Sequence, residues 1–246
     1  TAIEYYTKSL KIRKESDLLD EQPGGKKQIA KTLNNIGHIY KRKGDYAKAI
    51  DYYAQSLSIR EEIRDKKGIA STIGAIGLIY KHQGDLDKAI EYCNRSLVIG
   101  EEIKDISGIA NSLNSLGLIN NEQGNYAQAI EYHTKSLIIE EGIGNKSSIA
   151  ISLHNIASNY NDQGETDKAM EYYKKSLSIR EEIGDKSGIA HSLTNIGNIY
   201  YEQNQYAKAL NYGERSLAIA QSIGATRAVK NAAQLLSLNC PEYDVM

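Results

Sequence analysis

Apolar side chains between residues 68 and 104 recur at steps of three and four, which is typical of amphipathic helices. They form two groups, Ile69, Ile73, Ile76, Ile79 and Tyr80 in the first and Leu86, Ala89, Ile90, Cys93, Leu97 and Ile103 in the second. Gly84 and Asp85 separate the groups. Glycine is favoured in the left-handed conformation that ends a helix, and aspartate is favoured as the N-cap of the helix that follows. The pattern therefore predicts an antiparallel helical hairpin.

The same pattern returns every 40 residues. The segment "GDYAKAIDYYAQSLSIREEI" begins at Gly44, and similar segments begin at Gly84, Gly124, Gly164 and Asn204. A fixed internal period predicts a stack of like hairpins, because one hairpin cannot bury its apolar face alone. We therefore expect a single array over residues 1–246. Its expected parts are an unpaired second helix at 1–20, full hairpins at 27–65, 66–105, 106–145, 146–185 and 186–224, and a terminal first helix at 225–240.

Small residues occur once per period on each helix. They are Gly37, Gly77, Gly117, Ala157 and Gly197 on the first helices and Ala49, Ala89, Ala129, Ala169 and Ala209 on the second. Glycine inside a helix costs roughly 1 kcal/mol relative to alanine, so its repeated use needs compensation. Close approach of the paired helices supplies that compensation.

These positions carry a resemblance to a known family. A small residue, a tyrosine three residues later, the turn glycine, and then alanine, tyrosine and serine at steps of four and three resemble the tetratricopeptide repeat, as in Gly37, Tyr40, Gly44, Ala49, Tyr53 and Ser56. The usual period is about 34 residues, and HEAT and armadillo units lie near 40. The small-residue and tyrosine positions favour the tetratricopeptide repeat, with one to two extra turns per pair, and no third helix is visible.

The resemblance implies an all-α solenoid of stacked antiparallel helix pairs, wound into a right-handed superhelix. Long-helix variants similar to this one occur in Leu-Gly-Asn-type adaptors, in Rap-type peptide receptors and in sensor regions of bacterial signalling proteins. In such repeats the first helix of each pair lines the concave groove. The resemblance therefore implies a peptide-binding groove formed by Lys31, Asn34, His38, Lys41, Lys81, Asn111, Asn114, Asn121, His154, Asn161, His191, Asn198 and Tyr201. For Asn35, Asn155 and Asn195, bracing of neighbouring helices is the favoured role.

Both ends depart from the repeat. Pro23, Gly24 and Gly25 lie in a longer connection after residue 20, and we expect them to form a mobile loop. At the other end Pro241 stops the pattern, so we expect Leu235, Leu236 and Leu238 to lack the helix that would cover them. The uncapped ends of a solenoid favour association with other chains. We therefore expect that the chain can form a homo-oligomer through its terminal helices.

Charge and composition narrow the class of partner. Lys and Arg total 30 against 31 Asp and Glu, for a net charge of -1. A neutral chain without an apolar run of membrane-spanning length predicts neither a nucleic acid nor a membrane partner. The sequence has 2 cysteines and begins "TAIEYYTKSL", without the features of a signal peptide, so we expect a cytoplasmic location.

Candidate chemistry changes this interpretation little. The 5 histidines form no pair at helical ligand spacing, so we expect no metal and no other cofactor. His133 and Cys93 replace the tyrosine that stands at 53 and 173, and both are interpreted as packing residues. Paired glutamates recur in register near helix ends, at Glu61 and Glu62, Glu101 and Glu102, and Glu181 and Glu182, where a solvated surface is the ordinary explanation. We expect no enzyme.

Three functions follow as hypotheses. The first is a scaffold that binds a peptide or protein segment in the concave groove, because asparagine amides offer both donors and acceptors to an extended backbone. The second is the sensory or regulatory module of a larger signalling protein, or an array that assembles through its ends. The third, binding of single-stranded RNA, is disfavoured by the neutral charge.

Overall fold

The computed structural model of the chain describes Lys8 and residues 23–239. Regular structure in this described part is entirely α-helical, which confirms the all-α repeat fold. The chain divides into two compact units, residues 1–123 and 124–246. The segment expected as an unpaired second helix, at 1–20, lies outside the described residues except for Lys8.

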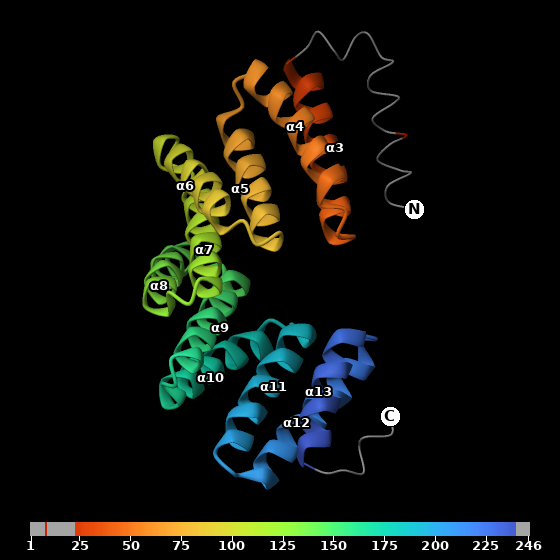
Figure 1. Ribbon diagram of the computed structural model, residues 1–246, viewed down its shortest axis with the longest axis vertical. Helices are drawn as coiled ribbons and strands as arrows, with labels where there is room; N and C mark the ends of the chain where they lie inside the picture. Colours follow the sequence, from red (N-terminus) through yellow and green to blue (C-terminus); the bar gives the residue numbers. More distant parts are fainter. Residues whose placement is uncertain (1–7, 9–22, 240–246) are drawn as a thin grey trace. The chain divides into compact units, whose positions relative to one another are not determined.

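Unit 1 is a stack of antiparallel helices drawn in red to yellow-green in Figure 1. Its helices are α3 (Pro23–Arg42), α4 (Tyr46–Glu62), α5 (Lys66–His82), α6 (Leu86–Glu102) and α7 (Ile106–Glu122). α3 pairs with α4 and α5 with α6, and α7 packs against both α6 and α5. We call α3, α5, α7, α9, α11 and α13 the A helices, and the even-numbered helices the B helices.

Unit 2 continues the alternation in green to blue (Figure 1). It contains α8 (Tyr126–Ile143), α9 (Lys146–Asp162), α10 (Thr166–Glu182), α11 (Lys186–Glu202), α12 (Tyr206–Ser222) and α13 (Thr226–Asn239). α9 pairs with α10 and α11 with α12, while α13 packs against both α12 and α11.

The turns between paired helices form as the sequence predicts. Gly44 and Gly84 have φ values of 78° and 81°, in the left-handed region where glycine is favoured. Asn204, which replaces glycine at the equivalent turn, has φ 59°. The next residue then caps the B helix, as where the Asp85 carboxylate accepts a hydrogen bond from the amide of Lys88.

A serine on each of the four B helices α4, α6, α10 and α12 ties the helix to its A helix. Its hydroxyl donates to the carbonyl of an alanine 26 residues earlier, which lies in the A helix of the same pair. The pairs are Ser56 with Ala30 at 2.7 Å, Ser96 with Ala70 at 2.9 Å, Ser176 with Ala150 at 2.7 Å and Ser216 with Ala190 at 2.8 Å. The serine of the repeat is therefore a buried fastener between the paired helices.

The small residue of the A helix makes room for a side chain from the B helix. A Cβ atom at Gly37 would lie 2.7 Å from the Tyr53 ring, and one at Gly77 would lie 2.9 Å from the Cys93 sulfur. Real Cβ atoms essentially never make contacts this short, so a larger residue at either site would force its neighbour to shift. The expected close approach of paired helices is confirmed there.

The prediction of a loop at Pro23, Gly24 and Gly25 is wrong, because these residues form the first turn of α3. Proline is well suited to this position, since the amide hydrogen that it lacks has no partner in the first turn of a helix. The turn signal in the sequence therefore marks the beginning of the helix.

The prediction that Leu235 and Leu236 lack a cover is also wrong, because only 1% and 0% of their surfaces are exposed. Gly213 stands where Tyr53 stands in its own repeat, and the two leucines fill the space of the missing ring. A Cβ atom at Gly213 would lie 2.8 Å from Leu236 Cδ2. The end of unit 2 is thus packed within the chain, which removes the reason given for association there. The side chain of Leu238 lies outside the described part of the chain.

Candidate functional site

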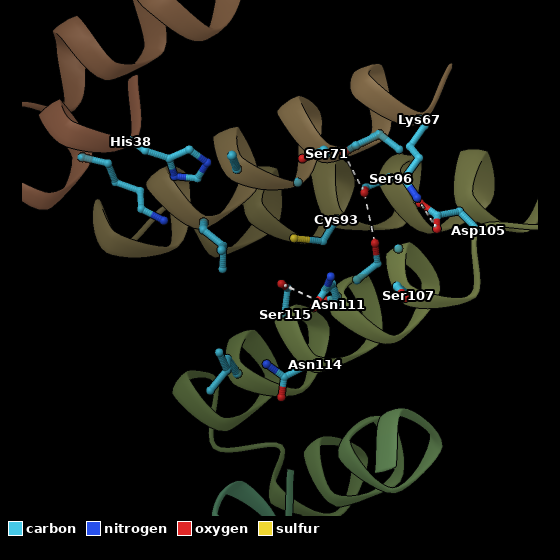
Figure 2. A pocket seen from close by; sticks show the side chains of 18 residues that line it. His38, Lys67, Ser71, Cys93, Ser96, Asp105, Ser107, Asn111, Asn114 and Ser115 are labelled. Carbon is cyan, nitrogen blue, oxygen red and sulfur yellow. Dashed lines mark hydrogen bonds and ion pairs between the residues drawn. The ribbon is translucent and has the colours of Figure 1, made fainter. Parts of the chain in front are cut away.

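Unit 1 contains a pocket of about 440 Å³ between α5 and α7, with its floor on α6 (Figure 2). We call it the α5–α7 pocket. Its lining residues are His38, Lys41, Lys67, Ala70, Ser71, Gly74, Ala75, Leu78, Cys93, Ser96, Asp105, Ser107, Gly108, Asn111, Ser112, Asn114, Ser115 and Leu118. Every one of them belongs to unit 1.

The lining of the pocket combines polar and apolar side chains. Ser71 on α5 and Asn111, Asn114 and Ser115 on α7 supply hydroxyl and amide groups. The Ser115 hydroxyl donates to the main-chain carbonyl of Asn111 over 2.9 Å, and the Asn111 side chain lines the pocket (Figure 2). The buried side chain of Cys93 on α6 lies between the walls, and the alanine and leucine side chains of the lining are on α5 and α7.

The two ends of the pocket differ in charge. At one end the Lys67 ammonium lies 3.0 Å from Asp105 Oδ1, and at the other lies His38 (Figure 2). Burial lowers the pKa of His38, and the nearby positive charge of Lys41 lowers it further. Burial also lowers the pKa of Lys41. His38 is therefore neutral near pH 7 and offers one donor and one acceptor.

The pocket brings together four of the residues predicted to bind a peptide, His38, Lys41, Asn111 and Asn114. The other predicted residues of unit 1 do not line it. Lys31 is exposed on α3, and Asn121 is half-buried near the end of α7. Asn34 is buried and accepts a hydrogen bond from Thr72 Oγ1 at 3.2 Å.

Lys81, also predicted for the groove, has a structural partner. Its ammonium group lies 2.5 Å from Glu122 Oε1, and only 12% of its side chain is exposed. This ion pair joins the end of α5 to the end of α7. The lysine thereby helps to fix the two walls of the α5–α7 pocket relative to each other.

In unit 2 the predicted residues are dispersed. His191 lines a shallow pocket of about 470 Å³ between α11 and α13, and Asn198 and Tyr201 line another of about 380 Å³ between the same helices. Asn161 is half-buried near the end of α9 and lines neither of these two pockets.

His154 lies against other side chains of unit 2. Its ring centroid is 5.2 Å from that of Tyr173, edge to face, and its Nε2 is 3.5 Å from the Asn195 amide, so Asn195 braces α11 against α9 as expected. Burial lowers the pKa of His154 to about 4, with smaller contributions from the charges of Arg180 and His191. His154 is therefore a neutral packing residue at pH 7.

The charged and hydroxyl groups at the Asp105 end of the pocket were not among the residues predicted from the sequence; they are Lys67, Asp105, Ser96 and Ser112. The Ser96 hydroxyl donates to the Ala70 carbonyl and lies 3.0 Å from the Ser112 hydroxyl. A signal was present in the sequence: Gly100, near the end of α6, aligns with Arg60 of the preceding repeat and with Arg180 two repeats later. Arginine at position 100 would reach this end of the pocket.

The remaining candidate chemical groups are buried. Burial raises the pKa of the Cys93 thiol to about 12, which leaves the thiol protonated and unreactive at pH 7. Burial lowers the pKa of His133 to about 4. Within the described residues, His, Cys, Asp and Glu side chains form no group of three or more that could hold a metal ion. No helix in the same part of the chain is both long and apolar enough to cross a membrane.

The family model described as "Tetratricopeptide repeat" matches residues 28–102, 68–139 and 148–222. The chain belongs to the tetratricopeptide repeat family. This confirms the resemblance of the sequence pattern. Repeats of this family are typical of scaffolds for protein interactions, and the families built on them are in general non-catalytic. None of the curated proteins compared with the sequence matches it.

Solved structures of similar fold come from several kinds of protein. BtubC from P. vanneervenii has a TM-score of 0.77 at 19% identity, over 90% of this chain and 91% of that one. A Rap protein complexed with competence and sporulation factor has a TM-score of 0.76 at 16% identity, over 89% of this chain and 66% of that one. A signal transduction ATPase with a tetratricopeptide repeat sensor, from Pyrococcus horikoshii, has a TM-score of 0.75 at 19% identity, over 94% of this chain and 36% of that one.

Proposed function

We propose that the chain is a non-enzymatic interaction module that binds a peptide segment of a partner protein in the α5–α7 pocket. The observation that carries the proposal is the pocket itself. Its volume of about 440 Å³ lies within the range of roughly 300 to 1,000 Å³ that is usual for ligand sites, and its lining combines apolar and polar side chains.

The walls suit the backbone of an extended peptide. The amides of Asn111 and Asn114 each offer a donor and an acceptor, and the hydroxyls of Ser71 and Ser115 add adaptable partners. Main-chain hydrogen bonds of this kind give affinity with little dependence on peptide sequence, whereas the pocket between the walls selects a side chain. The complex of a Rap protein of similar fold with competence and sporulation factor supports a ligand-binding role for such a module.

Selection from a random library of twelve-residue peptides displayed on phage tests the proposal directly. Peptides selected on the purified chain should bind it with a measurable Kd in fluorescence anisotropy. Substitution Ser71→Tyr, which puts a ring into the pocket from an exposed position on α5, should weaken their binding at least about tenfold, or 1.4 kcal/mol.

The matched control is Ile151→Tyr, at the equivalent exposed position on α9 in unit 2. It should leave the Kd within about twofold, a difference of less than 0.5 kcal/mol. Equal loss of binding in both variants, or none in either, would place the peptide outside the α5–α7 pocket and end the proposal.

The alternative is a sensory module of a signalling protein, in which ligand binding changes the packing of the helices. The structural match to a protein with a tetratricopeptide repeat sensor, which covers 94% of this chain, favours this alternative. Hydrogen exchange of the chain with and without a selected peptide separates the two functions. A sensor should show altered protection in helices beyond α5, α6 and α7, whereas a simple scaffold should show changes in those three alone.

The proposal includes a cytoplasmic location. The chain has 2 cysteines, and the described one, Cys93, is a free buried thiol, which suits a reducing compartment. Fractionation of source cells with an antibody to the chain tests this.

A further inference from the structure

Each B helix from α4 to α12 ends with the same backbone geometry. The carbonyl of one residue in its last turn accepts a hydrogen bond from the amide of the residue five positions later, which directly precedes the next A helix. The distances are 2.8 to 3.1 Å. The residues at this position are Arg60, Gly100, Glu140, Arg180 and Ala220. Because the backbone is equivalent, differences between the repeats here come from side chains alone.

In the first repeat, Arg60 occupies a socket made by three neighbours. Its Nε donates to Ser56 Oγ at 3.1 Å, and its Nη1 lies 3.0 Å from Asp65 Oδ2. The third neighbour is Gly68, where a Cβ atom would lie 1.5 Å from Nη1. A hydroxyl, a carboxylate and the absence of a side chain at Gly68 thus accommodate the guanidinium group. Arg60 as a whole is only 9% exposed.

In unit 2, Arg180 is held in the same way. Its Nε donates to Ser176 Oγ at 3.1 Å, and its Nη1 lies 3.7 Å from Asp185 Oδ2. A Cβ atom at Gly188 would lie 2.1 Å from Nη1. Serine, aspartate and glycine therefore accompany arginine in the two repeats of the described residues that have arginine at this position.

Where another side chain replaces arginine, the aspartate and the glycine change with it. The two cases read Glu140 with Asn145 and Ser148, and Ala220 with Ala225 and Ala228. Glu140 is buried and Ala220 packs in an alanine cluster, so each of these positions has its own complementary neighbours.

The repeat with Gly100 keeps the complete socket without its arginine. Ser96, Asp105 and Gly108 stand at the serine, aspartate and glycine positions, and all three line the α5–α7 pocket. The Ser112 hydroxyl lies 3.0 Å from the Ser96 hydroxyl, whereas Nε of the arginine contacts this serine in the two filled sockets.

Asp105 retains one oxygen for a ligand. Lys67 reaches Oδ1 at 3.0 Å, and among the described residues no hydrogen bond or ion pair reaches Oδ2, which points toward Gly108. The filled socket has the same arrangement, because Lys27 lies 4.0 Å from Asp65 Oδ1 while Arg60 contacts Oδ2. A second cation beside Lys67 is therefore compatible with this site.

We infer that the socket of Ser96, Asp105 and Gly108 binds the guanidinium group of an arginine side chain on the partner peptide. This inference rests on the proposed function and adds the specificity of the same pocket. The ligand guanidinium donates to Asp105 Oδ2 through one Nη and to Ser96 Oγ through Nε, in the manner of Arg60. Lysine fits less well, since its ammonium is a single point and not a planar fork.

The library selection supplies the first test, through the arginine content of the recovered peptides. Peptides selected on the wild-type chain should be enriched in arginine, and replacing that arginine by citrulline should raise the Kd at least about tenfold, or 1.4 kcal/mol. Replacement by lysine should cost less than replacement by citrulline, because lysine keeps the charge.

The variant Gly100→Arg fills the socket from within. A Cβ atom at Gly100 would lie 3.4 Å from its nearest neighbour, Ile109 Cγ1, which is an ordinary van der Waals contact. Gly100→Arg should abolish the enrichment in arginine and weaken arginine peptides at least about tenfold, whereas the control Gly100→Ala, which leaves the socket open, should stay within about twofold.

A second probe separates failure of this inference from failure of the proposed function. N-acetyl-arginine methylamide should shift the amide resonances of Ser96 and Gly108 in nuclear magnetic resonance spectra, and N-acetyl-citrulline methylamide should not. Pocket peptides that tolerate citrulline, together with no shift from the arginine probe, would overturn the inference and leave the proposed function standing. If no peptide is recovered, the proposed function fails and the arginine probe alone decides the socket.

Discussion

The helices α5, α6 and α7 of unit 1 and the helices α9, α10 and α11 of unit 2 are the same three elements 80 residues apart, yet only the first set encloses the α5–α7 pocket. Three small residues of unit 1 become large in unit 2. Gly74 is replaced by His154, Cys93 by Tyr173, and Gly100 by Arg180.

In unit 2 the three large side chains lie close together. The rings of His154 and Tyr173 are 5.2 Å apart, and the charge of Arg180 contributes to the low pKa of His154. The comparison teaches that the repeat fold does not by itself provide a binding site. The α5–α7 pocket lies where unit 1 omits three large side chains that unit 2 has at the equivalent positions.

The largest effect on stability is expected when the buried ring of Tyr173 in unit 2 is removed. Tyr173→Cys, which introduces the unit 1 residue, should lower the free energy of unfolding by about 3 kcal/mol, because a buried ring is lost and a cavity remains. Urea denaturation followed by circular dichroism measures this. The control Tyr206→Cys changes a tyrosine that is 50% exposed and should cost less than about 0.5 kcal/mol. Equal costs would show that Tyr173 does not fill unit 2.

Removing the arginine of unit 2 should have the next largest effect. Arg180→Ala removes the guanidinium group that donates to Ser176 Oγ and pairs with the Asp185 carboxylate, and it should lower the free energy of unfolding by about 2 to 3 kcal/mol. We expect the lower part of that range because the Asp185 side chain is 39% exposed. Arg215→Ala, at an exposed arginine of α12, is the control. A loss no greater than that of the control would contradict the filled socket.

Acid should weaken unit 2 through His154. Its folded-state pKa of about 4 lies below the unfolded value of about 6.5, so the unfolded chain binds more protons between these values. Stability is therefore complete above pH 6.5 and falls as the pH is lowered toward 4. Between pH 7 and pH 5 the loss from His154 alone should be about 2 kcal/mol.

Urea denaturation at pH 7 and pH 5 checks this prediction when the wild type is compared with His154→Gln. The variant should lose about 2 kcal/mol less on acidification, while His133, whose pKa is also about 4, contributes equally to both proteins. An identical acid response in the two proteins would mean that His154 is as accessible to protons in the folded chain as in the unfolded chain.

The smallest effect is expected from filling unit 1. Cys93→Tyr should raise the free energy of unfolding by about 1 kcal/mol, since ring burial is partly offset by crowding. Gly77 leaves room for the ring, as Gly37 does for Tyr53. Urea denaturation at pH 7 detects the change. A destabilised variant would indicate that the space beside Cys93 is too small for a side chain of this size, and so too small for a ligand.

The repeat fold was predictable because its signals recur. Helix faces, turn glycines such as Gly84 and the close approach at Gly37 each follow from local rules that the sequence states several times. The structure of the two ends was not predictable. Proline is common both in loops and in the first turn of a helix, so Pro23 did not distinguish the two. Leu236 fills a space that only the packing around Gly213 reveals.

The candidate site was predictable only in part. His38 and Asn114 were found from the positions that line the groove in the family, whereas Asp105 and Ser96 were missed because they sit on a cap and on a B helix. Their importance lies in a relation between three distant residues, in which Gly100 lacks the side chain that Arg60 places beside Asp65. Such a relation emerges when structure shows which side chains meet.

The measurement that tests the account most directly is a titration of a selected peptide into a variant of unit 1 that carries all three large residues of unit 2, Gly74→His, Cys93→Tyr and Gly100→Arg. Fluorescence anisotropy should show the peptide bound to the wild type and no saturable binding to the triple variant, with circular dichroism confirming that the variant is folded. An unchanged Kd in the folded triple variant would contradict the claim that omission of these side chains creates the binding site.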